Sequence, residues 1–311
     1  MARIALLGAT AHIAKGLAAS LAKRGHELLL YARRPAAAAH FTATQGIQAP
    51  LHSLDAFGTE RCDMVINAIG AGDPGRIAGL GADVFRVTER WDNAVLDHLA
   101  NSPDTLYLFL SSGAVYGDGF SQAVGEDSRF TVSVNALDGQ NFYGLAKLHA
   151  EAKHRALQRF NIVDVRVFAY FSRFIDQSGR SFAAELAYAV ANGTEFQTDA
   201  TDMIRDYAGP EDIATLAERA LASRPFNGPV DLYSRAPVGK FALIDRMVSD
   251  FNVQVRILPS IATISATGAK ACYQSMWRRA SDLGWEPRAT ALDTVTEEMT
   301  ALISRGTQRV L

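Results

Sequence analysis

The sequence predicts an α/β fold built on a doubly wound parallel sheet. Apolar runs typical of buried strands recur through the first half of the chain, and patterns with helical periodicity lie between them. The first apolar run ends at a glycine that opens a helix. Because strand and helix alternate, helical crossovers would join parallel strands. With 311 residues, 48% of them hydrophobic, the chain can form one large domain or two unequal ones.

The elements of the first half follow in a regular order. Each expected strand is short and apolar, and each expected helix has an apolar face. We expect strands near residues 2–8, 27–32, 62–69, 105–111 and 162–168, and helices near 12–25, 83–101 and 140–160.

The alternation loosens after residue 168. An irregular connector over 171–179 leads to a helix over 181–192, and Pro210 with the acids after it begins another helix, where the helix dipole favours negative charge. A strand near 229–233 is expected to return to the main sheet. We therefore predict a dinucleotide-binding Rossmann domain over 1–168 and a smaller C-terminal α/β substrate-binding domain over 169–311.

The first strand, turn and helix are typical of a unit that binds a dinucleotide. Backbone N–H groups at the start of the helix would hold the pyrophosphate. The usual pattern has three glycines, whereas here Ala11 and Ala14 occupy two of the positions, and alanine at 11 restricts the approach of backbone to phosphate. Plain helix packing is the alternative. The cofactor-binding residues expected here are Gly8, Thr10, Ala11, His12 and Ile13.

The end of the second strand indicates which dinucleotide is preferred. Enzymes that use NAD place an acid near this point to hold the ribose 2′-hydroxyl, whereas arginine neutralises a 2′-phosphate. The run Tyr31-Ala-Arg33-Arg34 has two arginines and no acid. We therefore predict that NADP(H) is preferred, with NAD(H) as the alternative. The two arginines could also be solvated surface residues that bind no cofactor.

The chain also contains a tyrosine, a lysine and a serine that could move a proton. Tyr143 and Lys147 lie four residues apart and would share one face of a helix, where the ammonium favours the phenolate and lowers the pKa of the tyrosine. Ser112, at the end of the fourth apolar run that precedes this helix, could hold the same substrate oxygen. Alone, the pair could also be an exposed tyrosine beside a solvated lysine.

Composition excludes several classes of function. A net charge of −2 gives no electrostatic footprint for nucleic acid or for an anionic membrane surface. The two cysteines, Cys62 and Cys272, match no metal-ligand spacing, so we expect no metal site. No apolar run is long enough to span a membrane, and the N-terminus lacks the design of a signal peptide. We therefore expect a soluble, cytoplasmic protein.

These motifs together resemble the extended short-chain dehydrogenase/reductase family, of the NAD-dependent epimerase/dehydratase type that modifies nucleotide sugars. The resemblance covers nearly the whole chain. It rests on Gly8-Ala-Thr-Ala-His-Ile-Ala14, Asp63-Met-Val-Ile-Asn-Ala-Ile69, Ser111-Ser-Gly-Ala-Val-Tyr-Gly117, Tyr143-Gly-Leu-Ala-Lys-Leu-His-Ala-Glu151, Arg205-Asp-Tyr207 and Leu283-Gly-Trp285.

The resemblance implies a role for each matched residue. It makes Tyr143 the catalytic acid or base, Lys147 its partner that also grips the nicotinamide ribose, and Ser112 the residue that orients the substrate oxygen. Arg205 would contact a substrate diphosphate, while Tyr116 would lie beside the sugar or simply pack. The cofactor-binding set then also includes Ala68, Ile69, Tyr143 and Lys147.

Two departures from the family narrow the reaction. Alanine stands at position 169, where many members have an asparagine that binds the substrate phosphate. No carboxylate follows Ser112, which argues against a 4,6-dehydratase. The resemblance then implies an NADPH-dependent reductase of a nucleotide-linked keto sugar of the 4-keto-6-deoxyhexose type. A nucleotide-sugar 4-epimerase with retained NAD, a reductase of a small ketone and a non-catalytic NADP-sensing protein are the alternatives.

The helices near 83–101 and 140–160 indicate whether the protein forms a dimer. Both have more apolar positions than one core face requires, among them Val95, Leu96 and Leu99. In the family these helices form a bundle across a dimer, so we expect a homodimer, with packing inside the chain as the alternative.

Overall fold

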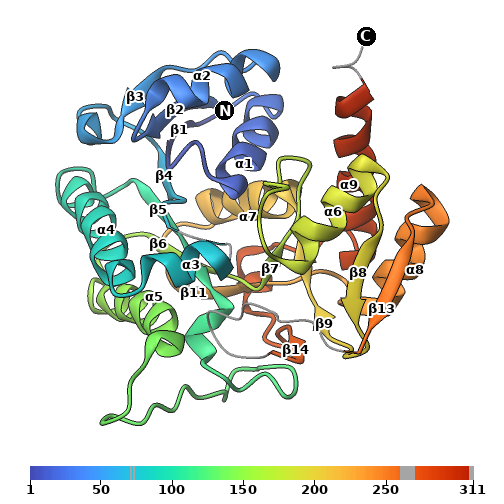
Figure 1. Ribbon diagram of the computed structural model, residues 1–311. Coiled ribbons are helices and arrows are strands. Elements are labelled where there is room, and N and C mark those ends of the chain that lie inside the picture. Colours follow the sequence, from blue (N-terminus) through green and yellow to red (C-terminus); the bar gives the residue numbers. More distant parts are fainter. Residues whose placement is uncertain (71, 73, 260–269, 308–311) are drawn as a thin grey trace.

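The computed structural model describes residues 1–70, 72, 74–259 and 270–307. A sheet of seven parallel strands forms its centre, in the order β11-β6-β5-β4-β1-β2-β3 (Figure 1). From β1 the chain first adds strands on one side and then, from β4, on the other. The predicted doubly wound fold is confirmed, and the strand order reverses between β1 and β4, where ligands bind in such sheets.

The sheet strands are β1 (Arg3–Leu7), β2 (Glu27–Ala32), β3 (Leu51–Ser53), β4 (Met64–Asn67), β5 (Leu106–Ser112), β6 (Ile162–Val167) and β11 (Asn227–Leu232). The helices that flank the sheet are α1 (His12–Lys23), α2 (Pro35–Thr44), α3 (Pro74–Leu80), α4 (Asp83–Asn101), α5 (Gly139–Ala156) and α7 (Pro210–Ala222). Short 3-10 turns are η1 (Leu54–Ala56), η2 (Gly113–Tyr116) and η3 (Arg279–Leu283).

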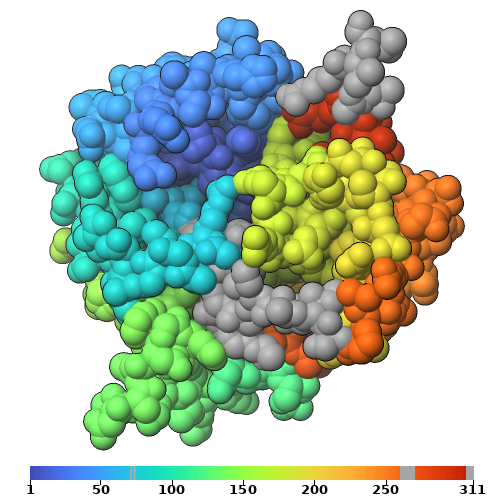
Figure 2. Space-filling model, in the orientation of Figure 1, coloured from blue at the N-terminus to red at the C-terminus, as the bar shows by residue number. Residues whose placement is uncertain are grey.

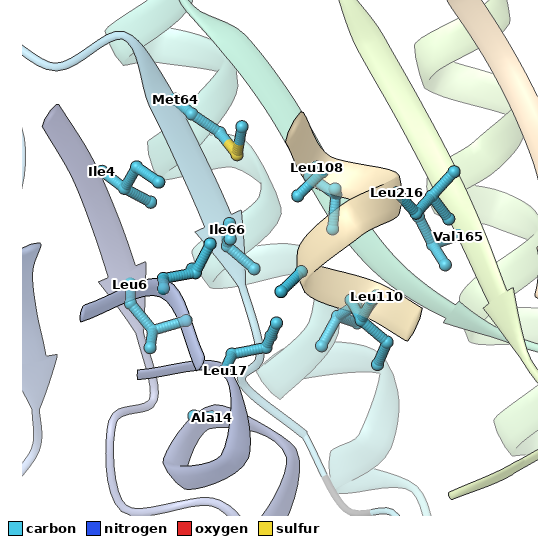
Figure 3. Packing of buried hydrophobic residues seen from close by; sticks show 14 of the residues in the cluster. Ile4, Leu6, Ala14, Leu17, Met64, Ile66, Leu108, Leu110, Val165 and Leu216 are labelled. Carbon is cyan, nitrogen blue, oxygen red and sulfur yellow. The ribbon is translucent and has the colours of Figure 1, made fainter. Parts of the chain in front are cut away.

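Alternating side chains of the strands build two separate cores. In β1, Ile4 and Leu6 face α1 and α7, whereas Ala5 and Leu7 face α4 and α5. Strand side chains alternate in direction, so a sheet covered by helices on both faces needs apolar residues at every position. Figure 3 shows the first core, where Leu17 of α1 and Leu216 of α7 pack over β1, β4, β5 and β6.

The remaining elements gather beyond the carboxyl ends of the sheet strands and around a third core. In Figure 1 they lie on the right, and in Figure 2 they form the yellow and orange half beside the blue and cyan one. These elements are β7 (Ala169–Tyr170), α6 (Phe182–Asn192), β8 (Phe196–Asp199), β9 (Ile204–Arg205), β10 (Tyr207–Ala208), β12 (Val238–Gly239), α8 (Lys240–Phe251), β13 (Val255–Leu258), β14 (Cys272–Tyr273) and α9 (Ala291–Thr307).

β11 joins the central sheet from within this second half of the chain. It pairs with β6 from Asn227 to Leu232, although more than fifty residues separate the two strands. The division of the chain at residue 168 stays a prediction, and residues 308–311 of the proposed second domain lie outside the described residues.

The helices α4 and α5 lie side by side on one face of the sheet. Val95 and Leu99 of α4 are fully buried within the chain, so these two residues serve the core and not an interface. Leu96 and Leu145 are half-buried. The homodimer stays a prediction. Within the described ranges, no helix combines the length and the apolar character needed to cross a membrane.

Candidate active site

The predicted site residues gather where the strand order reverses. Gly8 follows β1, Ala68 follows β4 and Ser112 ends β5. These three strands are neighbours and parallel, so their carboxyl ends meet at one edge of the sheet. The fold alone therefore brings the predicted cofactor motif and Ser112 together.

The turn after β1 holds backbone where a side chain would not fit. Gly8 has a φ of +82°, a region that favours glycine. A Cβ there would lie 3.0 Å from the carbonyl oxygen of Ala68 and 3.1 Å from a side-chain carbon of Ile69. The N–H groups of Gly8 and Ala9 both donate to the carbonyl of Tyr31, at 2.9 Å each. This glycine thus lets the ends of β1 and β4 approach each other closely.

The start of α1 suits an anionic group. Ala11 precedes the helix, no side chain caps the first N–H groups, and the first turn has no acid. Uncapped N–H groups at a helix start attract phosphate. Thr10 beside them is exposed, and Ile13 is half-buried against the core. The residues present therefore fit a dinucleotide.

His12 belongs to the same turn but has a partner inside the protein. Its Nε2 lies 2.8 Å from the hydroxyl of Ser172, and its ring packs edge-on against Tyr170. Burial lowers the pKa of His12 to about 4, so the ring is neutral at pH 7. His12 therefore adds no charge to the cofactor site.

Arg33 and Arg34 follow β2, and both are exposed. Arg34 immediately precedes Pro35, the first residue of α2. No acid of the described chain forms an ion pair with either arginine. Both guanidinium groups thus remain available to an anion that reaches the end of β2.

Tyr143 and Lys147 lie on the buried face of α5. Asp138 and Asn141 form a capping box that fixes where this helix begins. Tyr143 is 8% exposed and Lys147 is 3% exposed. The Lys147 ammonium donates to the carbonyl of Leu110 at 2.8 Å and lies 6.0 Å from the centroid of the Tyr143 ring.

Burial dominates the ionisation of this pair. It raises the pKa of Tyr143 to about 12, against a hydrogen bond with Ser112 that lowers it. It lowers the pKa of Lys147 to about 8, although Asp92, Glu151 and Asp164 oppose the change. The expectation that Lys147 lowers the pKa of Tyr143 is therefore not met here. With its pKa raised to about 12, Tyr143 is protonated at neutral pH.

Ser112 lies between two tyrosines. Its hydroxyl oxygen accepts the Ala114 N–H at 3.1 Å and lies 3.3 Å from the hydroxyl of Tyr273, and Ser112 is close enough to Tyr143 to lower the pKa of that phenol. Tyr273 comes from β14, 161 residues further along the chain. No sequence motif marked Tyr273, because long-range contacts bring it here: β14 pairs with β9, and the Cys272 N–H donates to the Phe120 carbonyl at 2.9 Å.

Arg205 and Lys270 place two cations near Tyr273. The Arg205 guanidinium donates to the carbonyl of Lys270 at 2.7 Å and lies 6.0 Å from the Tyr273 ring. The Lys270 ammonium lies 4.1 Å from the same ring, and burial lowers its pKa to about 7. Neither cation forms an ion pair with an acid in the part of the chain that the structure describes. Sequence reasoning found Arg205 but not Lys270, which no motif includes.

Tyr116 is bound within the protein itself. Its hydroxyl accepts a hydrogen bond from Arg166 and donates one to Asp231, each at 2.8 Å. Its ring stacks on Phe168 with the centroids 6.1 Å apart. Of its two expected roles, packing is the one that the structure displays; contact with a sugar stays a prediction.

Known structures share this fold over the full chain. A UDP-glucose-4-epimerase from Stenotrophomonas maltophila, with bound NAD and a formylated UDP-arabinopyranose, is 18% identical, has a TM-score of 0.79 and matches over 100% of both chains. A UDP-N-acetylglucosamine 4-epimerase from Methanobrevibacter ruminantium is 13% identical, with a TM-score of 0.81 and coverage of 98% of this chain and 99% of that one. At these identities the likeness concerns the fold.

The sequence itself identifies the family. No curated protein matches the chain. The model of the NAD dependent epimerase/dehydratase family, however, matches residues 4–230, which include the dinucleotide turn, Ser112, Tyr143 and Lys147. The resemblance predicted from the motifs is confirmed, and the chain belongs to the NAD dependent epimerase/dehydratase family.

Proposed function

We propose that the protein is an NADPH-dependent reductase of a nucleotide-linked keto sugar, of the 4-keto-6-deoxyhexose type. The observation that carries this proposal is the buried phenol of Tyr143, which lies beside Ser112 at the switch point of the sheet with the Lys147 ammonium 6.0 Å from its ring centroid. A ketone reductase needs a proton donor at that place, and a phenol whose pKa is raised keeps its proton until the oxygen becomes basic.

The residues of this chain would divide the work as follows. Ser112 and Tyr143 hold the carbonyl oxygen of the substrate. Bound NADPH would supply a hydride to the carbonyl carbon. As negative charge develops on the oxygen, Tyr143 transfers its proton to it, and the carbonyl becomes an alcohol. The Lys147 ammonium, fixed by the Leu110 carbonyl, would grip the nicotinamide ribose of the bound cofactor.

The preference for NADPH rests on the end of β2. Arg33 and Arg34 are exposed there, and no acid lies between Tyr31 and Arg34 to bind a ribose hydroxyl. A guanidinium group binds a 2′-phosphate with two charge-assisted hydrogen bonds. A reductant that is exchanged at each turnover suits a reductase.

The proposal that the substrate is linked to a nucleotide rests on two basic side chains. Arg205 and Lys270 lie on the Tyr273 side of Ser112, and neither has an acid as partner among the described residues. A diphosphate suits this pair, because its negative charge would bind the Arg205 guanidinium and favour the protonated form of Lys270, whose pKa is about 7. The neighbours of this fold include a structure that holds a formylated UDP-arabinopyranose and one that holds UDP-glucose.

A 4-epimerase is the second candidate. Several enzymes with this fold are named as UDP-sugar 4-epimerases, and the Bifidobacterium longum example, 18% identical with a TM-score of 0.75, holds NAD and UDP and matches over 97% of this chain and 98% of its own. An epimerase would use Ser112, Tyr143 and Lys147 in the same way but would keep its NAD through the cycle.

The test is a turnover assay with a panel of nucleotide-linked 4-keto-6-deoxy sugars. Purified protein is mixed with each sugar and either NADPH or NADH, and loss of the nicotinamide absorbance is followed. We expect one nucleotide sugar to be reduced, faster with NADPH. If none is reduced and NAD stays bound through purification, the reductase is refuted and the epimerase takes its place.

A further inference from the structure

We propose that Tyr273 is a positioning residue that makes Ser112 a hydrogen-bond donor toward the substrate oxygen. The inference rests on the proposed function only in requiring that Ser112 hold an oxygen of the substrate, which a reductase and an epimerase both need. It adds to the site a residue from the far end of the chain.

The hydroxyl of Ser112 has few ways to bond. It has one proton to donate and two lone pairs that accept. The Ala114 N–H occupies one lone pair at 3.1 Å. The Tyr273 hydroxyl, 3.3 Å away, is within reach of the other. When Tyr273 donates, both lone pairs are filled, and the proton of Ser112 can point only toward Tyr143 and the substrate.

Tyr273 has the properties of the donor in this pair. Burial raises the pKa of its hydroxyl well above the usual value and outweighs the hydrogen bond with Ser112 and the charge of Arg205, which lower it, so the proton stays. Among the described residues, Ser112 is the one hydrogen-bond partner of this hydroxyl. The separation of 3.3 Å is long for two hydroxyls and would shorten once Ser112 itself donates, because hydrogen bonds in a chain strengthen one another.

The surroundings of Tyr273 hold its ring against Ser112. Phe120 packs edge-on at 4.7 Å between centroids, and Phe168 lies at 5.2 Å. Gly113 provides the space: a Cβ there would lie 2.7 Å from the Phe168 ring and 3.0 Å from the Tyr273 hydroxyl oxygen. The absence of a side chain next to Ser112 thus permits the second phenol to approach.

The consequence for the reaction is a chain of two hydrogen bonds. It runs from the Tyr273 hydroxyl to Ser112 and from Ser112 to the substrate oxygen. A donor that is itself hydrogen-bonded stabilises negative charge better than an isolated one. Tyr273 would thus act on the developing alkoxide without touching it.

The experiment is a double-mutant cycle with Tyr273→Phe, Ser112→Ala and both changes together. Phenylalanine keeps the ring contacts and removes only the hydroxyl. In Tyr273→Phe we expect kcat to fall by about tenfold, as for loss of one hydrogen bond to a charged group, while KM and NADPH binding stay unchanged. In the Ser112→Ala background the same change should have no further effect.

The matched control is Tyr233→Phe, which removes another half-buried hydroxyl, bonded to the Arg278 carbonyl at 3.4 Å. Its kcat should equal that of the wild type. Multiplicative losses in the double variant would show that Tyr273 does not act through Ser112, and a wild-type kcat in Tyr273→Phe would show that it does not act at all. Either result overturns the proposal.

The wild type is assayed first, with both the reductase and the epimerase substrates, so that failure of the proposed function is seen separately. If only the epimerase reaction is found, the cycle is run with that reaction. If neither occurs, the melting temperatures of the four proteins decide. Changes in melting temperature that are not additive in the double variant show that Ser112 and Tyr273 are hydrogen-bonded, and additive changes refute the bond.

Discussion

Tyr143 is the residue on which the proposed chemistry depends most. It is buried and protonated, and no other phenol on α5 could replace it. We expect Tyr143→Phe to lower kcat by at least about 100-fold, the usual contribution of a general acid, while NADPH binding measured by fluorescence stays unchanged. The control is Tyr188→Phe, whose side chain is 48% exposed. Turnover that survives in Tyr143→Phe would remove this residue from the mechanism.

Arg33 and Arg34 carry the cofactor preference. A charge-assisted hydrogen bond contributes about 1.5–3 kcal/mol, so replacing both by alanine should raise KM for NADPH by roughly 10- to 100-fold. KM for NADH should change little, because NADH has no 2′-phosphate. Arg129→Ala, at another exposed arginine, serves as the control. Equal effects on both cofactors would contradict the assignment.

At the scale of residues, local spacing predicted one part of the site and could not predict the other. Tyr143 and Lys147 share a helix face, and Ser112 ends a strand next to it, so their meeting follows from short-range pattern. Tyr273 reaches Ser112 through long-range contacts of β14, which pairs with β9 and bonds to the Phe120 carbonyl. A two-residue strand leaves no periodicity in a sequence. The pKa of Tyr143 was also out of reach, because it depends on burial.

At the scale of elements, α1 depends on a glycine that the sequence did not mark. A Cβ at Gly16 would overlap the Tyr170 hydroxyl and would lie 2.9 Å from Pro210, the first residue of α7. We expect Gly16→Ala to destabilise the protein by about 1–3 kcal/mol through overpacking, despite the better helix propensity of alanine. Chemical denaturation measures this loss.

The control is Gly79→Ala, in the exposed part of α3, where a Cβ would meet nothing within 4 Å. That change should be neutral or slightly stabilising. If Gly16→Ala is as stable as Gly79→Ala, then α1 and α7 have room between them that the structure does not show.

The strands of the central sheet were the most predictable elements. Each is a short apolar run bounded by polar residues, and the expected positions agree with β1, β2, β4, β5 and β6. The helix α2 was not predicted as such, because an alanine run after a proline has helix propensity but no clear apolar face. β3 has three residues and so lacks the alternation that identifies a strand.

For the whole molecule, buried charges make stability depend on pH. His154 is fully buried, with Nδ1 2.5 Å from Asp164 and Nε2 2.7 Å from Asp92. Burial lowers the pKa of His154, but these hydrogen bonds and the two charges together outweigh it and raise the pKa to about 9 from a usual 6.5. Because its pKa is higher in the folded than in the unfolded protein, His154 contributes stability that is fully present below about pH 6.5. This contribution is lost as the pH rises through about 9.

We therefore expect the melting temperature of the wild type to fall between pH 7 and 9.5 relative to that of His154→Gln. The comparison with the variant is needed because burial lowers the pKa of Lys147, whose contribution rises over the same range. The exposed His40→Gln should follow the wild-type curve. Parallel curves for wild type and His154→Gln would show that His154 does not titrate in this window.

The proposed function requires that the protein reduce a sugar carbonyl with a hydride from NADPH. The most direct measurement uses NADPH with deuterium at both C4 positions and the active nucleotide-linked keto sugar, with the product analysed by mass spectrometry and NMR. We predict one deuterium per product molecule, on the carbon that bore the carbonyl, and one NADP⁺ formed for each. A product without deuterium, or an isomerised sugar with no cofactor consumed, would contradict the account.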